Sequence, residues 1–304
     1  RIGAATQCRS HGGDSVASEN SGRRTSRLIP RAGGCRLLIH DPIPIPDLSI
    51  IIVSHNKPVL VKEAVQSVLN QTHSDWEAVL VDSGVLLEQG CFGFIQDPRF
   101  RVIPSGETRE LAGQKNMASW CFNRVLNEGL VSGELILYLC DDDLLYPEAF
   151  ETLWRFYTEH GREPQAMYAS QDIGVLERDG TTRVIGKRMA DRLAGKVCRG
   201  SRLDCRVDYL QFCHTRQVLA KFREAYGTDR FHSEDKEEAS HADGIFMEQI
   251  GALVPVHPVP QVLSLNRRTP DSANMVYSDN RVGRGINLIR AKMKGAVRRL
   301  KGKR

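Results

Sequence analysis

Hydrophobic and polar residues alternate in blocks between residues 48 and 160, and the blocks predict strands and helices in turn. Residues 48–53 and 77–81 are apolar, β-branched runs of strand length. Between them, apolar residues recur at three- and four-residue spacing over residues 60–69, which predicts an amphipathic helix. Strand–helix–strand units of this length indicate parallel strands with right-handed crossovers. We therefore expect an α/β fold with a mostly parallel central sheet and helices on both faces.

The pattern continues through residue 160 and then becomes less regular. The later part of the chain predicts a short strand at 101–103, a helix from about 111 that closes near Gly129, a strand at 134–140 and a helix at 147–160. It then predicts strands at 168–169 and 183–185, a partly helical stretch at 209–223, a helix at 243–250, and an edge strand at 254–265 that Pro258 and Pro260 interrupt. The alternation is therefore strong in the first half of the chain and weak in the second.

Three consecutive carboxylates, Asp141, Asp142 and Asp143, follow directly after the apolar run 134–140. Ligands of open α/β sheets collect at the carboxyl ends of the strands. Like charges repel one another unless a cation neutralises them, and hard oxygen ligands suit Mg²⁺ or Mn²⁺. The alternative is a solvated acidic turn before a helix that begins near Pro147.

Charge is distributed unevenly along the chain. Residues 1–36 carry seven Arg and residues 281–304 carry ten Lys or Arg, and without these two segments 25 basic residues stand against 35 acidic ones. An acidic body argues against a nucleic-acid partner. We expect a disordered lead-in at 1–46, a folded domain at 47–280 with halves 47–150 and 151–280, and a basic amphipathic tail at 281–304. The tail suits either an anionic membrane surface or free solution.

Eight cysteines are scattered with no C-x-x-C pair and no zinc-ligand spacing. Several of them lie within apolar runs, which is typical of core residues in a reducing compartment. No apolar run approaches the roughly 20 residues of a membrane span. The expected location is the cytoplasm, with the basic tail as the candidate contact with the inner membrane surface.

Several stretches together resemble glycosyltransferase family 2. They are Ser49–Asn56, the run Ala64–Thr72, the strand end Asp82-Ser83-Gly84, and the segment from Gly133-Glu134 through the aspartates to Pro147. Within this family the chain looks most like the bacterial spore-coat polysaccharide glycosyltransferase type, because of the Ser54–Lys57 loop, Thr108-Arg109 and the run Ala242–Phe246. The resemblance implies a GT-A fold, with a Rossmann-like nucleotide-sugar half and an acceptor half. Asp141 to Asp143 match the family's DXD segment.

The resemblance also implies roles for individual positions. The donor would contact Val53, Asn56, Lys57, Asp82, Arg109, Asp141 and Asp142, and a divalent metal, Mg²⁺ or Mn²⁺, would be held by Asp142 and Asp143. Asp243 falls at the family's catalytic base, and Asp235 in the pair Glu234-Asp235 is the alternative. Two positions depart from the family: His55 replaces an aromatic residue, and Ser83 replaces the second acid after Asp82.

The implied reaction is an inverting transfer of a sugar from a UDP- or dTDP-sugar to a hydroxyl acceptor, in polysaccharide, cell-surface glycan or glycoconjugate synthesis. It needs a base for the acceptor proton and charge stabilisation for the departing nucleoside diphosphate. Two alternatives remain: a non-catalytic sugar-nucleotide-binding protein of the same fold, and a nucleotidyltransferase. The second alternative normally needs a Gly-rich phosphate loop, which the loop Ser54–Pro58 lacks.

Other polar residues have both structural and functional interpretations. His214 follows an apolar stretch and is either a core residue or part of an acceptor site. The pair Arg267-Arg268 either reaches the diphosphate or lies exposed on the surface. His257 is the only nearby match to a metal-binding histidine found in some family members, and it matches poorly.

Overall fold

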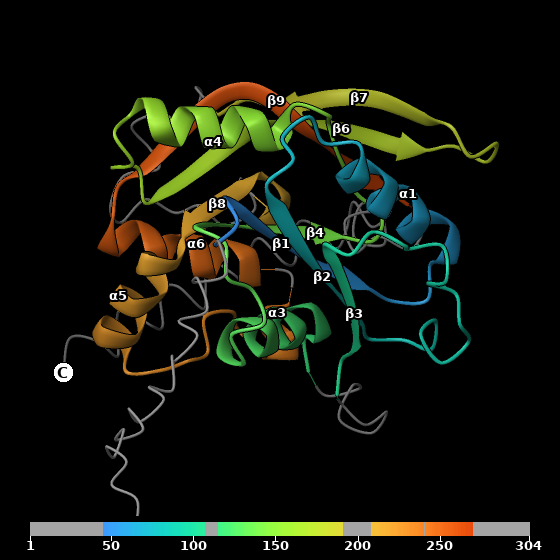
Figure 1. Ribbon diagram of the computed structural model, residues 1–304, viewed down its shortest axis with the longest axis horizontal. Coiled ribbons are helices and arrows are strands. Elements are labelled where there is room, and N and C mark those ends of the chain that lie inside the picture. Colours follow the sequence, from blue (N-terminus) through green and yellow to red (C-terminus); the bar gives the residue numbers. More distant parts are fainter. Residues whose placement is uncertain (1–44, 107–114, 191–207, 240, 270–304) are drawn as a thin grey trace, which may run out of the picture. The chain divides into compact units, whose positions relative to one another are not determined.

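The computed structural model describes residues 45–106, 115–190, 208–239 and 241–269 (Figure 1). Within these residues a nine-stranded sheet runs in the order β3-β2-β1-β4-β8-β6-β9-β5, and β7 pairs with β6. The first four strands of this order are all parallel: β3 (Phe100–Pro104), β2 (Trp76–Asp82), β1 (Leu48–Ser54) and β4 (Leu135–Cys140). The parallel sheet expected from the first half of the chain is confirmed.

The remainder of the sheet is mixed. Strand β8 (Phe212–Thr215) runs antiparallel to both β4 and β6 (Ala166–Leu176), whereas β9 (Val256–Arg268) runs parallel to β6. The two-residue strand β5 (Leu144–Leu145) and the hairpin strand β7 (Thr182–Arg188) pair antiparallel with β9 and β6. Because β5 directly follows the three aspartates, its pairing draws them toward β9.

Helices cover both faces of the sheet, as the sequence predicted (Figure 1). Helices α1 (Pro58–Leu69) and α4 (Ala149–Glu159) pack with Ile50, Leu80 and Leu137 on one face. The other face carries α3 (Met117–Asn127), α5 (Arg216–Tyr226) and α6 (Ala242–Leu253). Each large apolar side chain that is fully buried in these two cores stabilises the fold by about 1.5–3 kcal/mol.

Local sequence accounts for several helix ends. Pro58 begins α1 at a position where its missing N–H costs nothing, and Asn116 caps α3 by accepting from the Ser119 N–H. Gly227 ends α5 in the left-handed region with φ 63°. There are also two short 3₁₀ turns: η2 (Tyr209–Gln211) directly precedes β8, and η3 (Lys236–Glu238) lies in the segment between α5 and α6.

A half-buried carboxylate fixes the start of β4. Glu77 Oε1 accepts hydrogen bonds from Ser49 Oγ at 2.7 Å, Gly133 N at 3.1 Å and both the N–H and hydroxyl of Ser132. Gly133 lies so close to β1 that an added Cβ would stand 2.6 Å from the Leu48 carbonyl carbon. This contact lets β4 enter the sheet beside β1 in the register that brings its acidic end level with the end of β1.

Two expectations about the later half of the chain were wrong. The stretch 209–223 contains strand β8 between η2 and α5, and β8 is too short for a local pattern to reveal. Strand β9 is not at the edge, because it lies between β6 and β5. Its prolines are tolerated because Pro258 and Pro260 fall next to register shifts opposite Ala169 and Ser170, where the regular ladder is interrupted.

Several predictions fall on residues outside the described ranges. Arg109, most of the lead-in 1–46 and the tail 281–304 are among them, so the division into lead-in, domain and tail stays a prediction. In the described part of the chain, no helix combines the length and the apolarity that crossing a membrane requires.

Candidate functional site

The carboxyl ends of β1, β2 and β4 meet at one edge of the sheet. Ser54 pairs with Asp82, and Val53 pairs with Cys140, so the three loops that follow begin at the same level. This edge is where open α/β sheets bind ligands. The predicted residues Asn56, Lys57 and Asp141 to Asp143 lie on two of these loops, and the predicted Asp82 ends the third strand.

Lys57 joins the loop after β1 to the aspartates after β4. Its Nζ lies 3.0 Å from Asp141 Oδ1 and 2.8 Å from Asp142 Oδ2, and Asp141 Oδ2 also accepts from the His55 N–H at 2.7 Å. Burial alone would lower the pKa of Lys57, but the charges of Asp142 and Asp141 outweigh it and raise that pKa. The ammonium is therefore charged and neutralises one of the two carboxylates.

Asp143 lies on the opposite side of the cluster, against β9. Its Oδ1 accepts from the Arg267 N–H at 2.9 Å and from Asn266 Nδ2 at 3.2 Å. Burial, with the charge of Asp142 adding to it, raises the pKa of Asp143 well above its usual range. The guanidinium of Arg267 bonds to the main-chain oxygen of Asp142 and to Glu63 on α1. Arg267 is buried, which rules out for this residue the alternative of an exposed pair at 267–268.

Asp82 organises the loop after β2. Its two carboxylate oxygens accept from Gly84 N at 3.1 Å and Leu87 N at 2.8 Å, and its side chain is buried. Asn56 has a left-handed φ of 56°, and its Oδ1 accepts from Val85 N at 3.0 Å. Asn56 therefore ties the loop after β1 to the loop after β2.

Val53 differs from the other predicted donor residues, because its side chain is buried in the core on the α3 face of the sheet. A donor contact at this position would therefore be made by the main chain. Its neighbour His55 is exposed to solvent, and its Nδ1 lies 3.2 Å from both the carbonyl oxygen and the hydroxyl of Ser83. The two departures from the family pattern, His55 and Ser83, thus contact each other at the rim.

The two candidate bases have different surroundings. Asp243 lies in the first turn of α6, and its Oδ1 accepts from the Gly244 N–H at 2.8 Å. Burial raises the pKa of Tyr209, and the nearby charge of Asp243 adds to it. The ring of Tyr209 packs against Tyr138 of β4 with 5.7 Å between the ring centroids, so Tyr209 lies near both α6 and β4. Asp235 instead caps η3, with its Oδ1 accepting from the Glu237 N–H at 2.8 Å. Asp235 thus already has a structural role in this arrangement.

The predicted histidines belong to the scaffold. His214 is fully buried, its Nε2 lies 2.7 Å from the hydroxyl of Tyr138, and burial lowers its pKa to about 4, so it is a neutral core residue. His257 pairs with Met167 near the start of β9, nine residues before Asn266. At about 3.3 Å per residue that places it roughly 30 Å from the contact with Asp143.

The carboxylates of Asp141 to Asp143 supply some, but not all, of the ligands that a divalent cation needs. No group of three or more His, Cys, Asp or Glu side chains forms a metal site by itself in the described ranges. Magnesium, however, is often bound by one or two carboxylates, with substrate phosphates and waters completing its shell. The ammonium of Lys57 between Asp141 and Asp142 is a cationic stand-in that marks where positive charge is favoured. Asp142 is the more exposed of the two carboxylates, and its Oδ2 is the oxygen that bonds to Lys57.

Sequence reasoning located the acidic edge but not the contacts that support it. Asn266 and Arg267 contact Asp143 and the Asp142 carbonyl oxygen, and Arg267 in turn contacts Glu63, which lies 204 positions earlier in the chain. No local pattern could link them. The run Asn266–Thr269 directly after an apolar strand was the only available signal.

Three comparisons agree with this geometry. The profile of the family described as "Glycosyl transferase family 2" matches residues 49–197. Protein CgeD from Bacillus subtilis (strain 168) is 25% identical over 234 residues, which cover 76% of this chain and 52% of CgeD. The chain thus spans about half the length of this relative.

Solved structures share the fold. S. aureus TarS 1–349 in complex with UDP superposes with a TM-score of 0.54 at 16% identity, covering 74% of this chain and 61% of TarS 1–349. The complex of the same protein with UDP-GlcNAc superposes with a TM-score of 0.53 at 13% identity, covering 76% of this chain and 61% of TarS 1–349. At these identities the likeness establishes the architecture, which is the GT-A fold that the sequence predicted.

Proposed function

The chain belongs to glycosyl transferase family 2, and on that premise we propose that it transfers a sugar from a nucleotide-diphosphate donor to a hydroxyl acceptor. The observation that carries this proposal is the convergence of Asn56, Lys57, Asp82 and the three aspartates at one edge of the parallel strands. Each of these groups arrives there through strand register, and the edge combines hydrogen-bonding groups for a nucleoside with a charged cluster for a diphosphate.

The proposed transfer inverts the anomeric centre in one displacement. The acceptor oxygen forms a bond to the anomeric carbon while the bond from that carbon to the diphosphate oxygen breaks, and the hydroxyl proton passes to Asp243. Lys57 and Arg109 stabilise the charge that develops on the departing diphosphate. Asp243 is favoured as the base because α6 brings it near Tyr209, which packs against β4, whereas Asp235 is engaged in capping η3.

A divalent metal, Mg²⁺ or Mn²⁺, would be held by Asp142 and Asp143 together with the donor phosphates. When bound, it supplies Lewis-acid neutralisation of the leaving group. Lys57 faces the same carboxylates, so this side chain and the ion are alternative sources of positive charge at Asp142. Asp143 is preoriented for such a role by its contacts with Asn266 and the Arg267 N–H.

We further propose UDP or dTDP as the nucleotide and a glycan or glycoconjugate as the acceptor. Structures that share the fold hold UDP and UDP-GlcNAc, so UDP is the first nucleotide to test. The notion that residues 281–304 contact an anionic membrane belongs to the same proposal, because that segment is basic and carries no acidic residue.

One observation favours a second candidate, a non-catalytic protein that binds sugar nucleotides. Lys57 pairs with both Asp141 and Asp142, as a purely structural ion pair would. The two candidates differ in Asp243, which a binding protein does not need for its function.

The test is a transfer assay that follows nucleoside diphosphate release from UDP- and dTDP-sugars with a panel of glycan acceptors. Asp243→Asn should lower turnover by about 10²–10⁴-fold, the usual contribution of a general base, and should leave donor affinity unchanged. Asp235→Asn is the matched control and should retain turnover. Donor binding without turnover by the wild type on any acceptor would favour the binding protein, and lost turnover in Asp235→Asn alone would move the base to that residue.

A further inference from the structure

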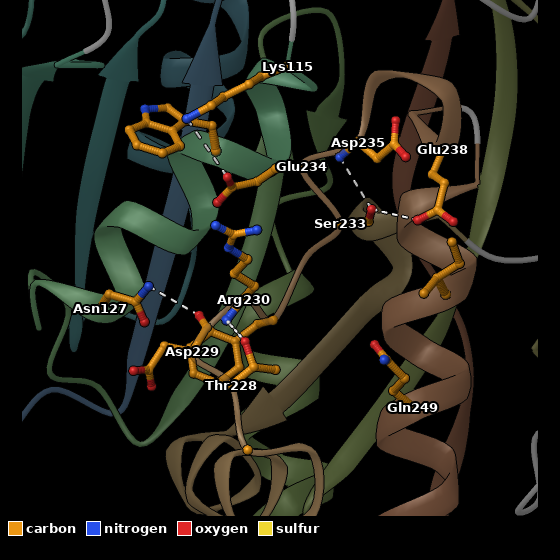
Figure 2. A pocket seen from close by; sticks show the side chains of 14 residues that line it. Lys115, Asn127, Thr228, Asp229, Arg230, Ser233, Glu234, Asp235, Glu238 and Gln249 are labelled. Atoms are coloured by element: carbon orange, nitrogen blue, oxygen red, sulfur yellow. Dashed lines mark hydrogen bonds and ion pairs between the residues drawn. The ribbon is translucent and has the colours of Figure 1, made fainter. Parts of the chain in front are cut away.

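A groove lies between α3, the segment 227–235 and α6, apart from the cluster of aspartates (Figure 2). Its volume is about 950 Å³, near the upper end of the roughly 300–1,000 Å³ typical of ligand pockets. We call it the α3–α6 groove. Of the residues assigned above to donor or base roles, only the alternative base Asp235 lines it. Its size would admit more than one sugar ring, so it is large enough for part of a chain.

The lining is polar and hydrogen-bonding. Asn127 and Gln249 contribute amides, and Thr228 and Ser233 contribute hydroxyls (Figure 2). Trp120, which belongs to α3, contributes its indole. A groove that anchors a peptide would normally offer deeper apolar pockets for side chains. Amides and hydroxyls beside an indole suit a polyhydroxylated ring instead, since the hydroxyl rim of such a ring can bond to them and its C–H groups can pack against an aromatic side chain. One face of the indole is covered by the Lys115 ammonium.

The walls of the groove are held in place before any ligand arrives. Trp120 Nε1 donates to the Ser105 carbonyl oxygen at 3.3 Å, and Lys115 Nζ lies 3.5 Å from the centroid of the indole. Glu234 Oε1 accepts from Asn123 Nδ2 at 2.9 Å. The side-chain amide of Gln249, by contrast, has no hydrogen bond within the described residues, so it is available to a ligand.

The groove is connected to the donor edge at two points. Ser105, which holds the indole of Trp120, donates its N–H to the Asp82 carbonyl oxygen at 2.8 Å. On the other wall, α6 carries Asp243 in its first turn and Gln249 six residues later, a rise of about 9 Å along the helix. The groove therefore leads away from the edge at which the proposed transfer takes place.

The charge of the groove limits what it can bind. Four carboxylates stand against two cations in the lining, namely Asp229, Glu234, Asp235 and Glu238 against Lys115 and Arg230. A polyanionic chain would meet net repulsion there, whereas a neutral or amino-sugar chain would not.

We propose that the α3–α6 groove binds the part of the acceptor glycan that is remote from the reacting hydroxyl, and that it selects neutral or amino-sugar chains over anionic ones. The inference rests on the proposed transferase function for its role, but binding in the groove can be measured without turnover. The groove would thereby set acceptor specificity at a distance from the chemistry.

The experiment is a titration of full-length protein with three oligosaccharides: an N-acetylglucosamine trimer, a glucosamine trimer and a galacturonate trimer. Of the three tryptophans, only Trp120 lines the groove, because Trp76 is buried in the core and Trp154 packs on α4 against Tyr157. The first two probes should change the tryptophan fluorescence, and the third should not. The change should disappear in Trp120→Phe, which keeps an aromatic ring at this position.

Calorimetry on Gln249→Ala supplies a second readout that leaves the indole intact. Loss of one or two hydrogen bonds should weaken oligosaccharide binding by about tenfold. The matched control is Gln66→Ala on the exposed side of α1, which should bind as the wild type does. Unchanged affinity in Gln249→Ala, preference for galacturonate, or no binding of any probe by protein that still binds UDP would overturn the proposal. Oligosaccharide binding without UDP binding would support the groove and refute the transferase function.

Discussion

Replacing Lys57 by Met removes the only positive charge that faces both Asp141 and Asp142 among the described residues. An ammonium 3 Å from a carboxylate gains about 5 kcal/mol at an effective dielectric constant near 20, before its desolvation is subtracted. Removing one partner of a buried pair typically costs about 3–5 kcal/mol. The side chain of Lys57 is 32% exposed, so solvent screening reduces that figure. We expect Lys57→Met to lower the free energy of unfolding by about 2 kcal/mol.

Denaturant unfolding measures this change, and Lys62→Met is the matched control. Lys62 lies on α1, which begins directly after Lys57, and is exposed, so its replacement should change stability by no more than about 0.5 kcal/mol. Added Mg²⁺ should raise the melting temperature of Lys57→Met more than that of the wild type, because an ion that binds the folded state stabilises it. If the two variants were equally stable and responded equally to Mg²⁺, the assignment of Lys57 as the counter-ion of the cluster would be refuted.

Three further substitutions test how the edge is built. Gly133→Ala should destabilise the protein by about 2 kcal/mol or more in denaturant unfolding, because its Cβ would lie 2.6 Å from the Leu48 main chain; wild-type stability would contradict the close approach. Gly84→Ala should weaken UDP binding in calorimetry with little loss of melting temperature, since its Cβ would displace the Asn56 side chain that joins two loops; unchanged affinity would exclude these loops from the donor site. Burial would raise the pKa of Glu77, but hydrogen bonds outweigh it and lower that pKa below its ordinary 4.5. The stabilisation by Glu77 is therefore complete above pH 4.5 and is lost as pH falls through the lower folded value, so Glu77→Gln should be destabilised at pH 7 and approach the wild type in acid. A pH-independent difference in unfolding free energy would contradict this.

The first half of the fold could be read from the sequence because its signals are local. The runs at 48–53, 77–81 and 134–140 are continuous and apolar, as strands buried on both faces require. The later strands gave no comparable signal. Strand β8 has four residues and exists because β4 and β6 flank it, and β9 contains prolines that are acceptable only at its irregular pairing with β6.

For the candidate site too, one part could be predicted from the sequence and another could not. Asp82 and the three aspartates stand at strand ends, so strand prediction and parallel topology were sufficient to bring them to one edge. Their individual surroundings depend on contacts between distant segments, such as Asn266 with Asp143 and Arg267 with Glu63. The α3–α6 groove was also beyond sequence reasoning, because its two walls are more than 100 residues apart in the chain.

The central claim is that the edge formed by β1, β2 and β4 binds a nucleoside diphosphate with the help of the aspartates. Calorimetric titration of UDP into the wild type and Asp142→Ala, each with and without Mn²⁺, tests it most directly, with dTDP as the second nucleotide. We expect binding that Mn²⁺ strengthens in the wild type and that is lost in Asp142→Ala. Binding that neither Mn²⁺ nor the substitution affects, or no binding of either nucleotide, would contradict it.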